Sequence, residues 1–317
     1  MMLPGPKVVL TMRSWTKFMS MIPMAVSAGM MAQTPRDPMV EANATRKLTA
    51  HVYAIEDKDT TPGVPNIGFV VGARAALVID TGMGERNGRT VLAEVEKIAP
   101  GRQLYLVTTH VHPEHDLGAG AFPATTKMIR SQDQLKDIDE FGYQLADVFS
   151  KRSAVNAELL KDAKFRKADI TFDKECTLDL GGVTARILAM GANHTRGDTA
   201  IFVPQDRVLF TGDIAMKGMP SFASPYSTVS HWLVSLDVLD ALKPKIVVPS
   251  HGPIGDAAYI ADYRVYLTAI RDRVVVLKKE GKTLDEAVKM ITAEMQGKYT
   301  DTGRLGGAIR AAYAEAK

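Results

Sequence analysis

Apolar residues recur along this chain with two spacings, one typical of strands and one typical of helices. Short apolar runs bounded by turn residues predict strands at 50–57, 66–72, 75–82, 104–107 and 125–131. Between the third and fourth runs, Val91, Val95 and Ile98 recur at helical spacing, and the helix they predict ends before Pro100. The first part of the chain is therefore predicted to combine strands with a helix.

The second part repeats this mixture. Residues 131–168 are predicted to be helical, and two strand hairpins follow at 176–190 and 199–213. A helix over 229–244 and a strand over 245–252 precede three helices in the tail from Asp256 onward. One of these three begins with a capping box from Thr283 to Glu286. Strands followed by helices in each half predict a layered α/β architecture rather than a helical bundle or a pure β-barrel.

Composition narrows the class of protein. The 317 residues are 46% hydrophobic and 24% charged, which suits one large globular domain or two small ones. The net charge of +3 with no long run of one sign argues against a nucleic-acid-binding surface. Cys176 is the single cysteine, so no internal disulfide can form, and a small packed hydrophobe is a better interpretation of it than a metal ligand.

The N-terminus has the layout of a secretory signal peptide over residues 1–32. Arg13 and Lys17 precede an apolar stretch that ends in small residues, with cleavage expected after Ala28 or Ala32. The apolar stretch is short for a membrane span of ~20 residues, so no stable membrane insertion is expected after cleavage. The sequence thus predicts export to the periplasm or secretion, and a disordered or weakly anchoring tail is the alternative.

Possible metal ligands follow four of the predicted strands. Five of the seven histidines lie at these strand ends, together with two carboxylates. The residues are His110, His112, Glu114, His115, His194, Asp213 and His251. Ligands at the ends of several strands can converge at one edge of a sheet. Imidazole nitrogens and carboxylate oxygens together suit zinc and other first-row metals.

The spacing favours two ions. His110 and His112 can reach one ion, Glu114 and His115 a second, and the two oxygens of Asp213 can bridge both. Two ions ~3.5–4 Å apart are a known means of activating a water molecule. Each residue taken singly could instead cap a helix or close a turn.

These motifs resemble the metallo-β-lactamase superfamily. The segments THVHPEHD, HTRGD, FTGD and PSHG, with VIDTGMG before them, occur in the family's order between residues 50 and 255. The resemblance implies an αββα sandwich of two facing β-sheets with outer helices. It implies that His110, His112 and His115 match the His-x-His-x-Asp-His motif, with further metal ligands at His194, Asp213 and His251. Asp80 matches an aspartate that supports the metal loop. The expected boundaries are a linker at 33–48, the metal-binding domain at 49–255 and a helical C-terminal extension at 256–317 packed on the same domain.

Two positions depart from the family pattern. Glu114 stands where the family has aspartate, and its extra methylene lengthens the reach by more than an ångström. Either the backbone adapts so that Glu114 still binds the second ion, or that ion binds weakly. Arg196 stands where proline is common and could direct a cation toward an anionic substrate, the alternative being a surface ion pair. Tyr226 and His231 on a later loop are further candidates for substrate contact, although ordinary loop roles suit them too.

The resemblance also implies an activity. Relatives with aspartate at the position of Asp213 act on thioesters, lactones and other carbonyl compounds. The predicted function is a binuclear zinc hydrolase of a small-molecule thioester, lactone or amide, with iron or manganese as other possible ions. A metal-bound hydroxide would attack the carbonyl, and Glu114 or Asp213 would relay the proton. The alternatives are β-lactamase activity and an iron-dependent oxidoreductase on the same fold. The lone cysteine argues against an iron–sulfur centre, and the oligomeric state is left open.

Overall fold

The computed structural model describes residues 36–57, 59–218, 221–298 and 304–317. These residues belong to one compact unit, Pro35–Lys317. The predicted signal peptide lies outside the described residues. Within them, no helix combines the length and the apolar character that crossing a bilayer would require.

The first sheet contains seven strands in chain order. They are β1 (Arg46–Lys47), β2 (Val52–Ile55), β3 (Ile67–Val71), β4 (Ala75–Ile79), β5 (Gln103–Val107), β6 (Lys127–Ser131) and β7 (Ile170–Phe172). Pairing is antiparallel from β1 to β4 and parallel from β4 to β7. The parallel part places the C-terminal ends of β4 and β5 side by side, and the residues that follow both strands can therefore meet.

The second sheet contains five strands. Their order is β12 (Ile246–Pro249), β11 (Val208–Gly212), β10 (Asp198–Val203), β9 (Thr184–Gly191) and β8 (Glu175–Asp179). The pair β11 and β12 is parallel and the other pairs are antiparallel. The predicted hairpins, β8–β9 and β10–β11, are both present.

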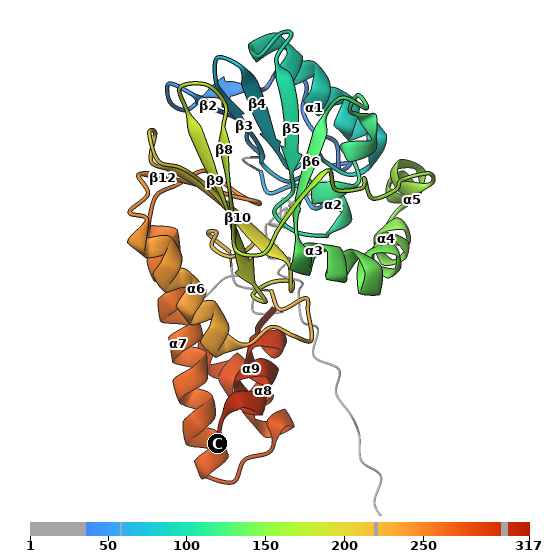
Figure 1. Cartoon of the computed structure of the whole chain (residues 1–317). Helices are drawn as coiled ribbons and strands as arrows, with labels where there is room; N and C mark the ends of the chain where they lie inside the picture. The colour runs from blue at the N-terminus through green and yellow to red at the C-terminus, as the bar shows by residue number, and fades with distance from the viewer. Residues whose placement is uncertain (1–35, 58, 219–220, 299–303) are drawn as a thin grey trace, which may run out of the picture. The chain divides into compact units, whose positions relative to one another are not determined.

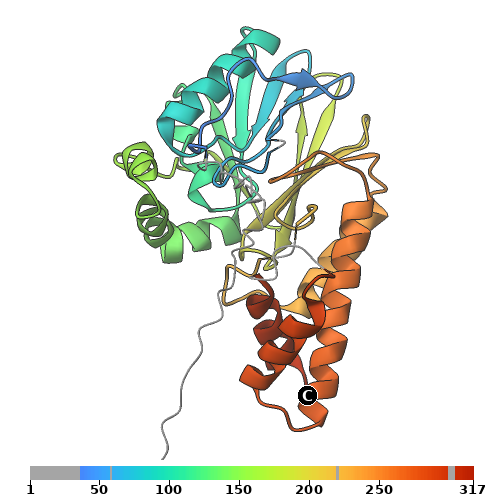
Figure 2. The same cartoon turned by 180° about the vertical axis from the view of Figure 1, so that it is seen from behind.

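The two sheets pack face to face (Figures 1 and 2). Leu77 of β4 and Ile201 of β10 belong to the apolar layer between the sheets. The next residue along β4, Val78, points the other way and packs with Val91 and Val95 of a helix. Because successive side chains of a strand point to opposite faces, a strand covered on both faces is apolar along its whole length.

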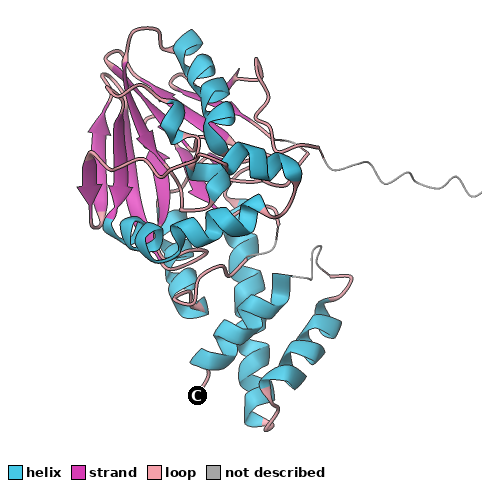
Figure 3. Ribbon diagram, turned by 90° about the vertical axis from the view of Figure 1, so that its right-hand side faces the viewer, coloured by secondary structure: helices cyan, strands magenta, loops and turns pink. Residues whose placement is uncertain are grey.

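Helices cover the two outer faces. Helix α1 (Gly84–Ile98) lies on the first sheet, and α6 (Val229–Ala241) and α7 (Ala258–Lys279) lie on the second, where Trp232 is fully buried. Helices α8 (Leu284–Met295) and α9 (Leu305–Glu315) pack against α7, and Figure 3 shows the C-terminal helices as a group beyond the strands. The αββα sandwich and its C-terminal helices are thus confirmed, as is the capping box at Thr283.

Between β6 and β7 the chain forms the helices that were predicted for residues 131–168. They are α3 (Gln132–Asp137), a π-helical turn at 138–142, α4 (Tyr143–Ser150) and α5 (Ala154–Leu160). The sequence pattern did not predict β1 or β7, because two or three residues are too few to show a periodicity. It also missed the short helix α2 (Pro113–Asp116) within the histidine cluster.

The segment before β1, which the sequence assigned to a linker, contacts helix α1. The backbone N–H of Val40 donates to Asn87 Oδ1 at 2.8 Å, and that of Asn43 donates to Glu94 Oε1 at 2.9 Å. Glu94 is buried, and its other oxygen accepts a hydrogen bond from Thr45. Side chains of α1 therefore hold this stretch of backbone in place.

Candidate metal centre

The histidine cluster begins where strand β5 ends. After Val107 the chain passes through two threonines and enters α2, with Pro113 at the first helical position. Proline suits that position because its fixed φ matches a helix and its missing N–H would have no partner there. His110 and His112 therefore precede the helix, while Glu114 and His115 lie on its only turn.

Three imidazoles come together as a first group. His110 Nε2 lies 3.1 Å from His112 Nδ1, and His194 Nε2 lies 3.2 Å from the same atom. All three side chains are buried. Nitrogens at ~2.0–2.1 Å from a tetrahedral zinc ion lie about 3.3 Å from one another. The three rings are thus spaced as they would be around one ion.

A second group lies beside the first. Glu114, His115 and His251 each present a ligand atom, and these atoms lie within 4.8 Å of one another. Asp213 lies between the groups, with Oδ2 at 3.3 Å from His194 Nε2 and Oδ1 at 3.8 Å from His251 Nε2. One carboxylate oxygen faces each group, which is the arrangement that a bridging ligand requires.

Several inward-facing atoms of this centre have no hydrogen-bond partner among the described residues. They are Glu114 Oε2, His115 Nε2 and Asp213 Oδ1, and each is buried. An unsatisfied buried polar group costs about 1–3 kcal/mol, and more when it is charged. Divalent ions held by these atoms would satisfy them together, so the donor set fits two metal ions.

The outward-facing ring nitrogens of three of the histidines have partners. His115 Nδ1 lies 2.9 Å from Asp80 Oδ2, His251 Nδ1 lies 3.0 Å from the carbonyl oxygen of Val64, and His194 Nδ1 faces the carbonyl oxygen of Ser221. Such contacts fix the tautomer and direct the other nitrogen inward. Asp80 has a φ of 62°, a left-handed conformation that non-glycine residues rarely adopt and that is found at functional sites.

The surroundings shift the pKa values of histidines in the two groups in opposite directions. Burial, reinforced by neighbouring imidazoles, lowers the pKa of His110 and His112 well below the ordinary value, so both rings are neutral and able to bind a metal. Burial opposes ionisation of Asp213, but the surrounding imidazoles, led by His194, lower its pKa below the usual range. Burial also disfavours a charged His115, yet Asp80 outweighs it and raises the pKa to about 9.

Two further carboxylates hold the loops that carry the ligands. Asp116 and Arg130 are both inaccessible to solvent, and Arg130 Nη2 donates to Asp116 Oδ1 at 2.7 Å. Thr108 Oγ1 also donates to Asp116, at 3.0 Å. Asp198 accepts a 2.6 Å hydrogen bond from the backbone N–H of His194. Asp116 and Asp198 belong to the quoted motifs, but no sequence pattern assigned them a partner, and Arg130 was missed.

A cavity of about 520 Å³ opens over this centre. Glu114, His194, Asp213 and His251 are among its lining residues. Other parts of the wall come from residues 60–63, the end of α4, the loop after Asp213, residues 252–253 and Arg304 at the start of α9. The helices after β6, the loop after β11 and the C-terminal extension each contribute to it.

The three residues suggested for substrate contact are engaged elsewhere and do not line this cavity. Arg196 forms ion pairs with Asp137 and Glu140, and its guanidinium lies 4.0 Å from the ring centroid of Tyr226. The Tyr226 hydroxyl donates to Glu140 at 2.8 Å. His231 Nε2 lies 2.9 Å from the carbonyl oxygen of Met190. The ion-paired alternative for Arg196 is thus the one that the structure contains.

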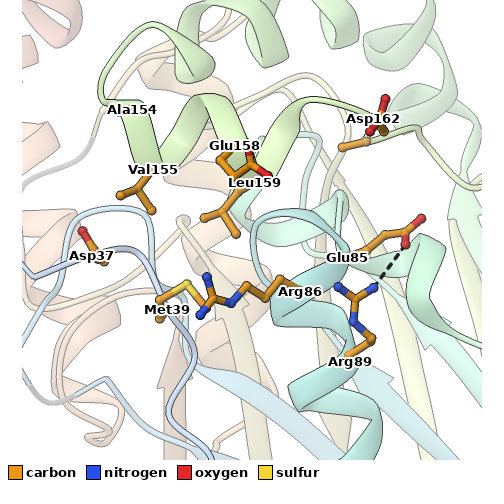
Figure 4. A pocket seen from close by; sticks show the side chains of 11 residues that line it. Asp37, Met39, Glu85, Arg86, Arg89, Ala154, Val155, Glu158, Leu159 and Asp162 are labelled. Carbon is orange, nitrogen blue, oxygen red and sulfur yellow. Dashed lines mark hydrogen bonds and ion pairs between the residues drawn. The ribbon is translucent and has the colours of Figure 1, made fainter.

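A second cavity, of about 530 Å³, lies between α1, α5 and the segment around Asp37 (Figure 4). Its wall combines carboxylates with arginines, and Arg89 pairs with Glu85 across one turn of α1 at 3.4 Å. No candidate metal ligand lines it. Of these two cavities, the first is the one lined by candidate metal ligands.

Three relatives show what this chain resembles. The linear primary-alkylsulfatase of Pseudomonas sp. is 24% identical over 251 residues, which cover 68% of this chain and 47% of that protein. The acyl-coenzyme A thioesterase MBLAC2 of Gallus gallus is 26% identical over 225 residues, covering 66% and 80%. The metallo-beta-lactamase type 2 of Bacillus cereus is 23% identical over 202 residues, covering 61% and 69%.

A solved structure and a family profile complete the comparison. The sec-alkylsulfatase Pisa1 from Pseudomonas sp. has the same fold, with a TM-score of 0.67 at 18% identity over 85% of this chain and 49% of that one. The chain thus spans about half the length of the alkylsulfatases it matches. The profile of the metallo-beta-lactamase superfamily matches residues 60–251, which include every candidate ligand. The chain belongs to the metallo-beta-lactamase superfamily.

Proposed function

We propose that this protein is a binuclear metal-dependent hydrolase, with zinc as its ion and a thioester, lactone or amide as its substrate. One observation carries the proposal. The two oxygens of Asp213 face two separate ligand groups, at 3.3 Å from His194 Nε2 and 3.8 Å from His251 Nε2. Imidazole and carboxylate donors of this kind suit zinc.

The geometry supports a role for each ligand. His110, His112 and His194 would hold the first ion, and Glu114, His115 and His251 would hold the second. Bound ions at such a site lower the pKa of a coordinated water and stabilise negative charge that develops on a substrate oxygen. Asp213 would keep the two ions at a fixed separation.

Glu114 has a second role in this proposal. Its Oε1 lies 4.0 Å from His115 Nε2, on the side of the second group. Its Oε2 is buried and has no partner among the described residues. The residue lines the cavity, so this oxygen can take a proton from the attacking water and return it to the leaving group. Asp213 is the other carboxylate within reach.

The relatives support hydrolysis and suggest which substrates to try. Their names include a thioesterase, an alkylsulfatase and a β-lactamase. An iron-dependent oxidoreductase would use the same ligand shell with a different ion. Elemental analysis of the purified protein separates these readings, because a hydrolase of this kind should contain about two zinc ions per chain.

The test combines metal content with turnover. His110→Ala and His194→Ala each remove one nitrogen of the first group, and both should lower bound metal and abolish hydrolysis of a panel of thioesters, lactones, sulfate esters and β-lactams. His51→Ala is the matched control, since His51 lies outside the cluster and contacts Asp206. Full activity in either of the first two variants would place the reaction elsewhere.

A further inference from the structure

Three basic side chains line the cavity over the metal centre. Arg152 follows helix α4, Lys217 follows Asp213 by four positions, and Arg304 stands at the start of α9 in the C-terminal extension. They come from segments that are far apart in the sequence. No short motif could have shown that they share one wall.

Two of these side chains, Arg152 and Lys217, are not neutralised by carboxylates of the described residues. Among the described residues that line the cavity, the acidic ones are Glu114 and Asp213, and both are candidate metal ligands. Neither the guanidinium of Arg152 nor the ammonium of Lys217 forms an ion pair within the described part of the chain. Lys151, next in sequence to Arg152, does pair with Asp147 on the same helix.

The position of Arg152 is defined by stacking. Its guanidinium carbon lies 3.4 Å from the ring centroid of Phe149. That ring in turn lies 5.6 Å from the ring centroid of His112. A stacked guanidinium keeps its hydrogen-bond donors in one plane, available to a planar or tetrahedral anion.

We propose that the substrate of this site carries a negatively charged group, a carboxylate or a sulfate, next to the bond that is broken, and that Arg152 and Lys217 hold this group. The inference rests on the proposed hydrolase function and adds the class of substrate to it. Guanidinium donors match pairs of carboxylate or sulfate oxygens, and a cleft lined with one sign of charge concentrates ligands of the opposite sign. Arg196 has no part in this, because Asp137 and Glu140 already neutralise it.

The kinetic test uses a pair of esters that differ in charge. The zinc-loaded protein is given 4-carboxyphenyl butyrate and its neutral methyl ester, and kcat/KM is measured for each. The ratio compared is kcat/KM for the charged ester divided by kcat/KM for the neutral ester. Arg152→Gln should lower this ratio about tenfold relative to the parent, as expected for one lost charged hydrogen bond. Lys217→Gln should lower the ratio further when combined with it. Comparing ratios between proteins cancels the intrinsic reactivity of the esters.

Lys151→Gln is the matched control, because it removes one positive charge next to Arg152 but outside the cavity lining. A ratio that is the same in Arg152→Gln, its double variant with Lys217→Gln and the parent would overturn the inference. Cleavage of 4-nitrophenyl sulfate, lost in Arg152→Gln, would identify the anion as a sulfate ester. Cleavage of the carboxylate ester alone would identify a carboxylate.

A binding measurement separates this inference from the proposed function. Titration calorimetry of sulfate and of benzoate into the zinc-loaded protein should show affinity that falls about tenfold in Arg152→Gln and is retained in Lys151→Gln. If no ester is hydrolysed but this pattern holds, the hydrolase proposal fails and the anion site stands. If esters are hydrolysed and neither anion distinguishes the two variants, the anion site fails and the hydrolase stands.

Discussion

Replacement of Glu114 by aspartate tests how closely the site is built around glutamate. The substitution keeps the charge and withdraws the carboxylate by one carbon–carbon bond, about 1.5 Å. The backbone of α2 cannot follow, because the two residues after Glu114 are held by buried contacts. His115 Nδ1 lies 2.9 Å from Asp80, and Asp116 is paired with Arg130.

The size of the effect follows from the geometry. Glu114 Oε1 is already 4.0 Å from His115 Nε2, and the three ligand atoms of the second group span at most 4.8 Å. A withdrawal of ~1.5 Å takes the carboxylate out of that range. A catalytic group misplaced by 1 Å can cost ~100-fold in rate. We therefore expect Glu114→Asp to lose about 100-fold in kcat/KM and to bind the second ion weakly, and we expect the same of Glu114→Ala.

The assay is a zinc titration of the metal-free protein, followed by turnover of whichever substrate the panel identifies. The parent should take up two ions, and Glu114→Asp should show a weakened second step. Glu158→Asp provides the same shortening at an exposed position in the second cavity (Figure 4) and should match the parent. Two ions bound with parental affinity and full turnover in Glu114→Asp would refute the reasoning that a fixed backbone demands the longer side chain.

Three more predictions follow from the contacts around the centre. Arg130→Met leaves the buried Asp116 unpaired and should lower the free energy of unfolding by about 3–5 kcal/mol, measured by urea denaturation; a loss below about 1 kcal/mol would contradict this. Asp80→Ala should weaken zinc affinity about 10–100-fold with the fold retained by circular dichroism, because a supporting contact to a ligating imidazole is lost. The exported protein should begin near Gly29 or Gln33 by mass spectrometry, and an intact Met1 or Met12 start would exclude the signal peptide.

Local patterns in the sequence were enough to identify most of the elements and the ligand types. Strand β4 and helix α1 were recognisable because alternation and helical spacing report directly which side of an element is buried. The capping box at Thr283 is read from four adjacent residues, so nothing distant could change it. The histidines were recognisable as possible ligands because they follow apolar strands, although their metal roles stay predictions.

Tertiary structure decided everything that depends on distance between segments. The sequence could not show that Asp213 presents one oxygen to each group of imidazoles, since that depends on how β11 of one sheet meets β5 of the other. It left Arg196 open between a cation for an anionic substrate and a surface ion pair, and the fold pairs Arg196 with carboxylates and brings Arg152 to the cavity. The physical reason is that the spacing of apolar residues along a short segment indicates which side chains are buried. Which residues those side chains contact depends on how sheets and helices pack, and this packing brings together residues that are far apart along the chain.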